Sequence, residues 1–117
     1  MDVLVVVDMQ KDFISGALGT KEAVAIVQRV AKKIAQAKKA GKTVVFTRDT
    51  HHENYLQTQE GKNLPVPHCI ENTPGWEIDP ALDTTGARIF DKPSFGSEEL
   101  VQYLKGLDNL TSAEFVG

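Results

Sequence analysis

The sequence predicts an α/β protein, with a parallel sheet flanked by helices on both faces in a Rossmann-like three-layer arrangement. Residues 3–7 form a continuous, largely β-branched apolar run, which is typical of a strand covered on both faces. Residues 43–47 repeat this pattern, and a helical periodicity lies between the two runs. Strand, helix and strand in this order form a βαβ unit, whose crossover is expected to be right-handed.

The helix between these strands has recognisable signals at both ends. Thr20 is the expected N-cap, and Glu22 places a negative charge in the first turn, where it interacts favourably with the helix dipole. Apolar residues recur at steps of three and four between positions 23 and 37, which predicts one stripe facing the sheet. Lys38 and Lys39 fall in the last turn, and Gly41 stands where a helix commonly ends.

The segment 48–86 carries little regular patterning, yet it holds all three histidines and the only tryptophan. Long irregular connections inside a compact domain are usually functional. We expect only short helices there, at residues 54–59 and 80–83. A third strand is predicted at residues 87–91, then a helix capped by Ser97 and ending near Gly106, and a fourth strand at residues 112–116. Because a parallel strand is normally followed by a crossover helix, we expect the fold to be incomplete at its C-terminus.

The composition indicates a single domain over residues 1–117. Apolar residues make up 41% and charged residues 25% of the chain, which are ordinary values for a globular protein. The net charge is -3 and the lysines are spread along the predicted helices, so no nucleic-acid partner is expected. The apolar runs are far shorter than a membrane span, and no secretory signal is visible. We therefore expect a cytoplasmic protein that does not bind membranes, and a homo-oligomer on general grounds.

Asp49, His51 and His68 offer a carboxylate and two imidazoles, the ligand set of an open transition-metal site. Asp49 and His51 follow the second strand, and residues two apart point to the same side while the chain stays extended. This set suits Zn²⁺, Fe²⁺ or Mn²⁺, and three protein ligands leave room for water or substrate. In the alternative interpretation, Asp49 caps a turn and the histidines are ordinary loop residues. His52 could replace His51 as ligand, although the alternation favours His51.

Two further charged residues, Asp8 and Lys92, close apolar strand-like runs. In open α/β sheets, ligands bind in the crevice beyond the carboxyl ends of the strands. Asp8 is therefore a candidate general base and Lys92 its cationic partner. The simpler interpretations are a loop-capping aspartate and a solvated lysine. Cys69 is expected to be a small buried residue rather than a nucleophile. Three apolar side chains could line a pocket for a flat ring or pack in the core: Phe13, Leu18 and Trp76.

Five motifs occur in a specific order along the chain. They are Asp8-Met9-Gln10-Lys11-Asp12-Phe13, Thr47-Arg48-Asp49-Thr50-His51, Pro67-His68-Cys69, Thr73-Pro74-Gly75 and Asp91-Lys92-Pro93-Ser94-Phe95-Gly96-Ser97. Together they resemble the isochorismatase-like cysteine hydrolases, and the Asp-x-His…His set resembles the nicotinamidase/pyrazinamidase branch. Since the resemblance runs over the whole chain, residues 1–117 are expected to be the N-terminal portion of one isochorismatase-like hydrolase domain.

The resemblance implies an amidohydrolase that converts nicotinamide to nicotinate and ammonia. It implies Asp8 as base, Lys92 as the cationic partner of Asp8, and Phe13 as a wall of the ring pocket. It also implies a divalent transition metal, with zinc expected first and iron or manganese as alternatives. The ligands of this metal would be Asp49, His51 and His68. The small-molecule amide is the expected partner. The nucleophile of the family is a cysteine in a Gly-x-x-Thr-Asp-x-Cys stretch after the fourth strand, and it is expected beyond residue 117.

Other functions are open at this point. Many members of the family have a tryptophan shortly before the Pro-His motif, where this chain has Asn63-Leu64-Pro65-Val66. An isochorismatase-type enzyme, or another cysteine hydrolase acting on a different small molecule, is therefore an alternative. A receiver-like signalling domain is an alternative of another class, but receivers have two adjacent acids after the first strand and Met9 stands at the second position. A catalytically inactive binding module is the remaining alternative.

Overall fold

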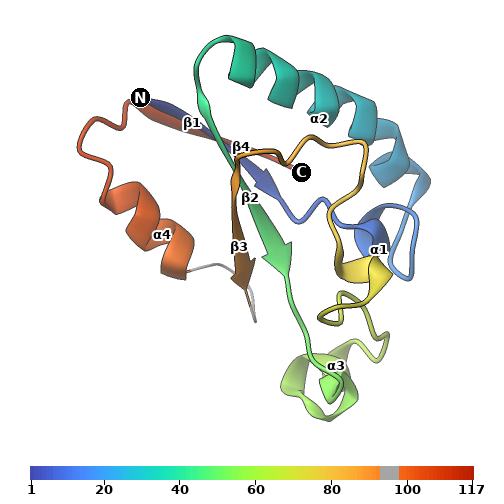
Figure 1. Ribbon diagram of the computed structural model, residues 1–117. Coiled ribbons are helices and arrows are strands. Elements are labelled where there is room, and N and C mark those ends of the chain that lie inside the picture. The colour runs from blue at the N-terminus through green and yellow to red at the C-terminus, as the bar shows by residue number, and fades with distance from the viewer. Residues whose placement is uncertain (93–97) are drawn as a thin grey trace.

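A computed structural model describes residues 1–92 and 98–117, which form a four-stranded parallel sheet with helices on both faces (Figure 1). The strands are β1 (Asp2–Val7), β2 (Thr43–Asp49), β3 (Arg88–Lys92) and β4 (Ser112–Val116). Their order is β3-β2-β1-β4, and each pairing is parallel. The predicted α/β class and parallel sheet are confirmed. The two apolar runs recognised in the sequence, β1 and β2, lie side by side at the centre.

The helix that connects β1 to β2 is α2 (Lys21–Lys39), and its ends are as the sequence predicts. The Thr20 hydroxyl accepts a hydrogen bond from the Ala23 amide at 2.9 Å, which satisfies one of the free donors of the first turn. Gly41 adopts a φ of 77°, the left-handed conformation that glycine reaches without a steric penalty. The amides of residues 41 and 42 then bond back to carbonyls of the last turn and close the helix.

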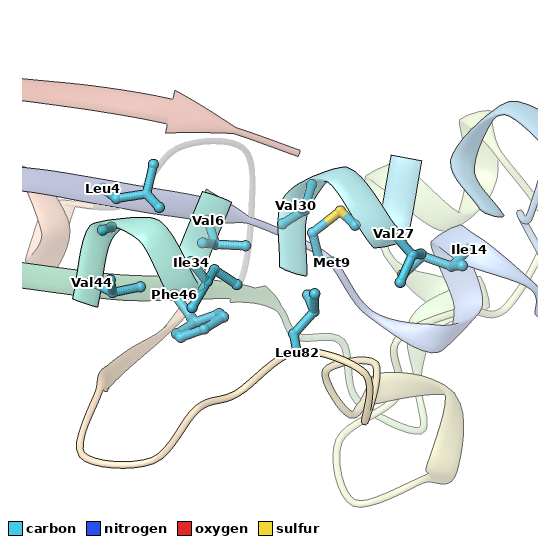
Figure 2. Close-up of a cluster of buried hydrophobic side chains, with 11 residues drawn as sticks. Leu4, Val6, Met9, Ile14, Val27, Val30, Ile34, Val44, Phe46 and Leu82 are labelled. Atoms are coloured by element: carbon cyan, nitrogen blue, oxygen red, sulfur yellow. The ribbon is translucent and has the colours of Figure 1, made fainter. Parts of the chain in front are cut away.

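Helices cover opposite faces of the sheet, because successive strand residues point to alternate sides. α2 packs on one face, and Figure 2 shows its side chains over β1 and β2. The residues labelled there are Leu4, Val6, Met9, Ile14, Val27, Val30, Ile34, Val44, Phe46 and Leu82. The other face is covered by α4 (Glu98–Lys105), whose Leu100 packs against Val3, Val5, Val45 and Phe90. Burying a side chain such as Ile34 stabilises the fold by about 1.5–3 kcal/mol.

Within the described residues, four short helical segments lie in the loops: α1 (Lys11–Ile14), η1 (Tyr55–Gln57), α3 (Gln59–Asn63) and η2 (Pro74–Trp76). The helix expected at residues 54–59 is thus split into η1 and the start of α3. The helix expected at residues 80–83 is wrong. Asp79 accepts bonds from the Ala81 and Leu82 amides there and forms a turn instead. The expected Ser97 cap lies outside the described residues. No helix among the described residues is long and apolar enough to cross a membrane.

Candidate metal and catalytic site

Asp8 and Lys92 meet at the carboxyl ends of β1 and β3. Lys92 Nζ lies 2.8 Å from Asp8 Oδ2, and the Thr47 hydroxyl donates a hydrogen bond to Asp8 Oδ1 at 2.7 Å. The Lys92 side chain is only 9% exposed, and an ammonium group buried to this extent requires a carboxylate partner. Asp8 itself has a left-handed φ of 50°, which is uncommon outside glycine and turns the chain sharply at the end of β1. Neither residue is therefore a solvated surface group.

Asp49, His51 and His68 form a compact group of possible metal ligands. One ligand atom from each of the three lies within 4.8 Å of the others. His51 Nε2 is 3.0 Å from Asp49 Oδ2, and His68 Nε2 is 3.7 Å from the same oxygen. Ligands bound to a zinc-sized ion at about 2.1 Å lie a little over 3 Å apart, and the two separations from Asp49 Oδ2 are close to that spacing. β2 continues to Asp49, two residues past its predicted end, and this extended geometry places Asp49 and His51 on one side.

The surroundings of His68 also fit a metal ligand. Its Nδ1 lies 2.8 Å from the Val66 carbonyl, which can only accept a hydrogen bond, so Nδ1 carries the proton. The Nε2 lone pair is then free to face Asp49 and His51, which is the arrangement that metal-binding histidines usually have. The Tyr55 ring packs edge-on against both imidazoles, with centroids 4.7 Å from His51 and 5.1 Å from His68. His52 is exposed, so the structure brings His51 and not His52 into the group.

Two residues that the sequence did not single out also belong to the site. Glu60 of α3 places Oε2 3.3 Å from His51 Nε2, which adds a second carboxylate beside the proposed ligands. Gln10 is fully buried, and its side-chain oxygen accepts a hydrogen bond from the Asp49 amide at 2.8 Å. Its side-chain nitrogen donates to the carbonyls of Asp49, at 2.8 Å, and Trp76, at 2.7 Å. No regular spacing marks either residue, because Glu60 reaches His51 across an irregular loop and Gln10 bonds to two other segments, at Asp49 and Trp76.

A cavity of about 540 Å³ joins the two groups. Asp8, Lys92, Asp49 and His68 all line it. The apolar wall includes Phe13, whose ring meets the His68 ring edge-on at 5.5 Å. The remaining lining residues are Val7, Leu18, Tyr55, Glu60, Asn63, Leu64 and Gly117. Trp76, considered from the sequence as a pocket residue, instead packs under the Arg48 guanidinium, 3.6 Å from the ring centroid.

Burial determines the electrostatics of the site. It raises the pKa of the Asp49 carboxyl, an effect that His51 opposes and the Asp8 carboxylate reinforces. A bound cation would offset this desolvation, which is a further reason why the group suits a metal ion. Cys69 is fully buried, and burial, together with the Asp49 and Asp12 carboxylates, strongly raises the pKa of its thiol. Cys69 is therefore an unreactive core residue, as expected from the sequence.

A family model for the isochorismatase domain matches residues 2–113. The chain belongs to the isochorismatase family. It is 32% identical over 100 residues to a nicotinamidase/pyrazinamidase of Mycobacterium tuberculosis, a match that covers 81% of this chain and 53% of the relative. The chain spans about half the length of the curated relatives that it matches.

Solved structures of the isochorismatase family share this fold. A pyrazinamidase of Pyrococcus horikoshii in complex with zinc is 34% identical, with a TM-score of 0.80 over 99% of this chain and 69% of that chain. An N-carbamoylsarcosine amidase of Thermoplasma acidophilum is 26% identical, with a TM-score of 0.74 over 95% of this chain and 65% of that chain. The family and the parallel-sheet fold implied by the sequence motifs are thus confirmed.

Proposed function

We propose that the full-length protein hydrolyses the carboxamide of a small nitrogen heterocycle, with nicotinamide as the substrate and nicotinate and ammonia as products. The observation that carries this proposal is the shared cavity. The Asp8–Lys92 ion pair and the Asp49 and His68 donors line one space of about 540 Å³, large enough for a flat ring and an ion. His51 stands beside Asp49, with Nε2 3.0 Å from Asp49 Oδ2. Two of the similar proteins, those of Mycobacterium tuberculosis and Pyrococcus horikoshii, are named for amide hydrolysis of this kind.

We assign Asp49, His51 and His68 as ligands of a divalent metal, and among the metals that suit this set zinc is favoured by the zinc complex of the similar pyrazinamidase. A metal bound there supplies a Lewis acid that can anchor a ring nitrogen. Three groups of this chain prepare the site for that role. Asp49 neutralises charge, the Val66 carbonyl fixes the His68 tautomer, and Phe13 forms an apolar wall for the ring. Substrate orientation is the role that this arrangement supports.

We assign Asp8 as the proton-transfer residue. Thr47 and Lys92 each hold one of its carboxylate oxygens, so the group is oriented before substrate arrives. In the proposed reaction Asp8 takes the proton of a cysteine thiol while sulfur bonds to the amide carbon. Asp8 then gives this proton to the leaving nitrogen as the C–N bond breaks and ammonia departs. Water attacks the thioester and gives a proton to Asp8, the C–S bond breaks as Asp8 returns this proton to sulfur, and the acid product loses its own proton to solvent and leaves as the carboxylate.

The nucleophile in this proposal is not Cys69. That thiol is the single cysteine of the sequence, is fully buried, and has a strongly raised pKa. The motif order places the nucleophile of the family shortly after β4, and Gly117, which follows β4, lines the same cavity as Asp8. We therefore assign the nucleophile to a cysteine beyond residue 117, with its sulfur near the Asp8 carboxylate.

A second candidate substrate class is favoured by one observation. Leu64 and Asn63 line the cavity where many nicotinamidases have a tryptophan, so a stacking surface for a ring is lacking at this position. A substrate without an aromatic ring, such as a carbamoylated amino acid or isochorismate, is the alternative. N-carbamoylsarcosine amidase from Thermoplasma acidophilum shares the fold at 26% identity.

The test uses the metal-replete full-length protein and three substrates. We expect ammonia release from nicotinamide to exceed release from N-carbamoylsarcosine, and no pyruvate to form from isochorismate. Greater ammonia release from N-carbamoylsarcosine, or pyruvate from isochorismate, would assign the non-aromatic substrate class, and no ammonia from nicotinamide would reject the proposed substrate.

Matched variants separate the roles of the two groups. Asp8→Asn should abolish turnover with the metal still bound, since the carboxamide cannot accept the thiol proton. His51→Ala should reduce bound metal well below one ion per chain, measured by plasma mass spectrometry. His52→Ala changes the exposed neighbour and should leave metal content unchanged. Full metal content in His51→Ala, or normal turnover in Asp8→Asn, would contradict the corresponding assignment.

A further inference from the structure

Asp12 makes a contact that the proposed chemistry does not explain. Its Oδ2 accepts a hydrogen bond from the backbone amide of Cys69 at 2.8 Å, although the two residues are 57 positions apart. Asp12 lies in α1, just after β1, whereas Cys69 directly follows the proposed metal ligand His68. The bond therefore ties the exit of β1, which carries Asp8, to the loop that carries a proposed ligand. A hydrogen bond to a charged acceptor is among the stronger ones in proteins.

The backbone at Cys69 needs such an anchor. Cys69 has a φ of 49°, a left-handed conformation that costs a residue with a side chain roughly 1–2 kcal/mol. Its carbonyl accepts a hydrogen bond from the His51 amide at 2.9 Å, and the His51 carbonyl accepts one from the Glu71 amide at 2.8 Å. The Cys69 carbonyl is thus paired to the chain at His51, and Asp12 holds the amide of the same residue, which belongs to the His68–Cys69 peptide. His68 is fixed relative to His51 by these bonds.

Two glycines make room for the Asp12 carboxylate. A Cβ added at Gly75 would lie closer to all three terminal atoms of the carboxylate than real Cβ atoms approach other atoms. A Cβ at Gly16 would meet the carboxylate at 2.5 Å and the Asp12 backbone at 2.8 Å. The φ of Gly75 is not in the left-handed region, so the side chain of Asp12, rather than the backbone, requires glycine there. The glycines therefore leave free the space that the carboxylate occupies when it accepts from the Cys69 amide.

We propose that Asp12 is a positioning residue for the metal site, which acts through the Cys69 amide to hold His68 at the distance from Asp49 and His51 that one ion requires. The proposal rests on the metal site of the proposed function. Asp12 does not itself belong to the ligand group, and its role is mechanical. The hydrogen bond, and not the negative charge, is what the site needs from it.

The first test compares Asp12→Ala with Asp12→Asn in the full-length protein. Asparagine removes the charge but keeps an oxygen that can accept from the Cys69 amide, so it should retain zinc affinity within a few-fold. Alanine should weaken zinc binding about 10–100-fold, as losses of groups that orient ligands do. Asp79→Ala is the control, because Asp79 also bonds a backbone amide, that of Ala81, but lies outside the site. Equal losses in Asp12→Ala and Asp12→Asn would show a charge effect and overturn the proposal.

The second test uses crowding instead of deletion. Gly75→Ala should push the carboxylate off the Cys69 amide and lower zinc affinity about as much as Asp12→Ala, with the ligands untouched. In the Asp12→Ala background the obstacle is gone, so Gly75→Ala should have no further effect. If Gly75→Ala lowers affinity equally in both backgrounds, it does not act through Asp12 and the proposal is wrong. This variant and Asp12→Asn decide the question if Asp12→Ala fails to fold.

A readout without metal separates this proposal from the proposed function. In metal-free protein, hydrogen exchange of the Cys69 amide should accelerate at least about 10-fold in Asp12→Ala and Gly75→Ala, since the hydrogen bond that protects it is lost. The nitrogen shifts of the His68 imidazole should move in both variants. Unchanged exchange and shifts would overturn the positioning role even if zinc binds. Wild-type protein that binds no zinc would reject the metal site, and with it the purpose that we assign to the Asp12 contact.

Discussion

Replacing Gln10 by glutamate should give a protein whose stability falls as pH rises. The Gln10 amide is fully buried, with its oxygen facing the Asp49 amide and its nitrogen facing the carbonyls of Asp49 and Trp76. In Gln10→Glu the shape is kept, but an oxygen replaces the nitrogen between two carbonyl oxygens. If the introduced carboxyl is ionised, it faces two acceptors and can donate to neither. If it is protonated, it donates to one of them.

The size of the effect follows from these contacts. The protonated form loses one of three hydrogen bonds, which costs about 1 kcal/mol. The ionised form is disfavoured by burial and by the two carbonyls, so the pKa of the introduced carboxyl rises above its unfolded value of about 4.3. Because its pKa is raised in the folded state, the introduced carboxyl binds a proton more tightly there than in the unfolded state. The stability of the variant is therefore highest below the unfolded pKa and falls as pH rises. At pH ~7.5, keeping the introduced carboxyl protonated in the folded state adds at most about 4 kcal/mol to the cost of the substitution.

Denaturant unfolding of variant and wild type measures this difference. We expect the stability deficit of Gln10→Glu to grow from about 1 kcal/mol near pH ~4.5 to as much as about 5 kcal/mol near pH ~7.5. Gln10→Met keeps the volume and removes all three hydrogen bonds, so its deficit should be about 3 kcal/mol and independent of pH. A Gln10→Glu deficit that stays constant over this range would refute the assignment of the amide contacts.

Lys92→Met should lower the free energy of unfolding by about 2–3 kcal/mol, less than for a fully buried pair because the Asp8 side chain is 21% exposed. Most of this lost free energy should be recovered in the double variant Asp8→Asn with Lys92→Met. A coupling energy near zero between the two substitutions would contradict the ion pair. Gly61→Ala should destabilise the fold by about 1–3 kcal/mol in thermal melts, because its Cβ would collide with the Tyr55 carbonyl, and an unchanged melting temperature would disprove that contact. The Cys69 thiol, with its raised pKa, should be alkylated at pH ~8 about 100-fold more slowly in the native than in the unfolded protein, and equal rates in peptide mass spectrometry would show that it is accessible. Because this pKa is raised in the folded state, the thiol stabilises the fold fully below its unfolded value of about 8.5 and loses this contribution as pH rises further.

The local signals of the sequence explain the central part of the fold. The apolar runs of β1 and β2, the Thr20 cap and the Gly41 stop each depend on neighbours within a few positions, and each is found where the sequence predicts it. The local signals of the segment 48–86 are harder to interpret, because a capping side chain such as Thr58 or Asp79 can either begin a helix or close a turn. The turn at Asp79 shows this, since a side chain that bonds nearby amides competed successfully with a helical pattern.

The same distinction applies to the site. Asp8 and Lys92 could be placed together from the sequence, because the carboxyl ends of parallel strands meet at one edge. Asp49 and His51 could be paired by the alternation of an extended chain. Glu60 and Gln10 could not be found in this way. Glu60 reaches His51 across nine positions of irregular chain, and Gln10 bonds to Asp49 and Trp76, 39 and 66 positions away, through an amide whose orientation only the fold sets.

The two crossover helices lie on opposite faces of the sheet, so neither of them forms the edge at which Asp8, Asp49 and Lys92 stand. That edge is supported by strand ends and by bonds between loops. Solvent-facing positions along α2 can therefore be recoded extensively, for solubility, labelling or attachment to a surface, without touching the cavity. In protein engineering, the exposed positions of the helices and the residues around the cavity could therefore be varied independently.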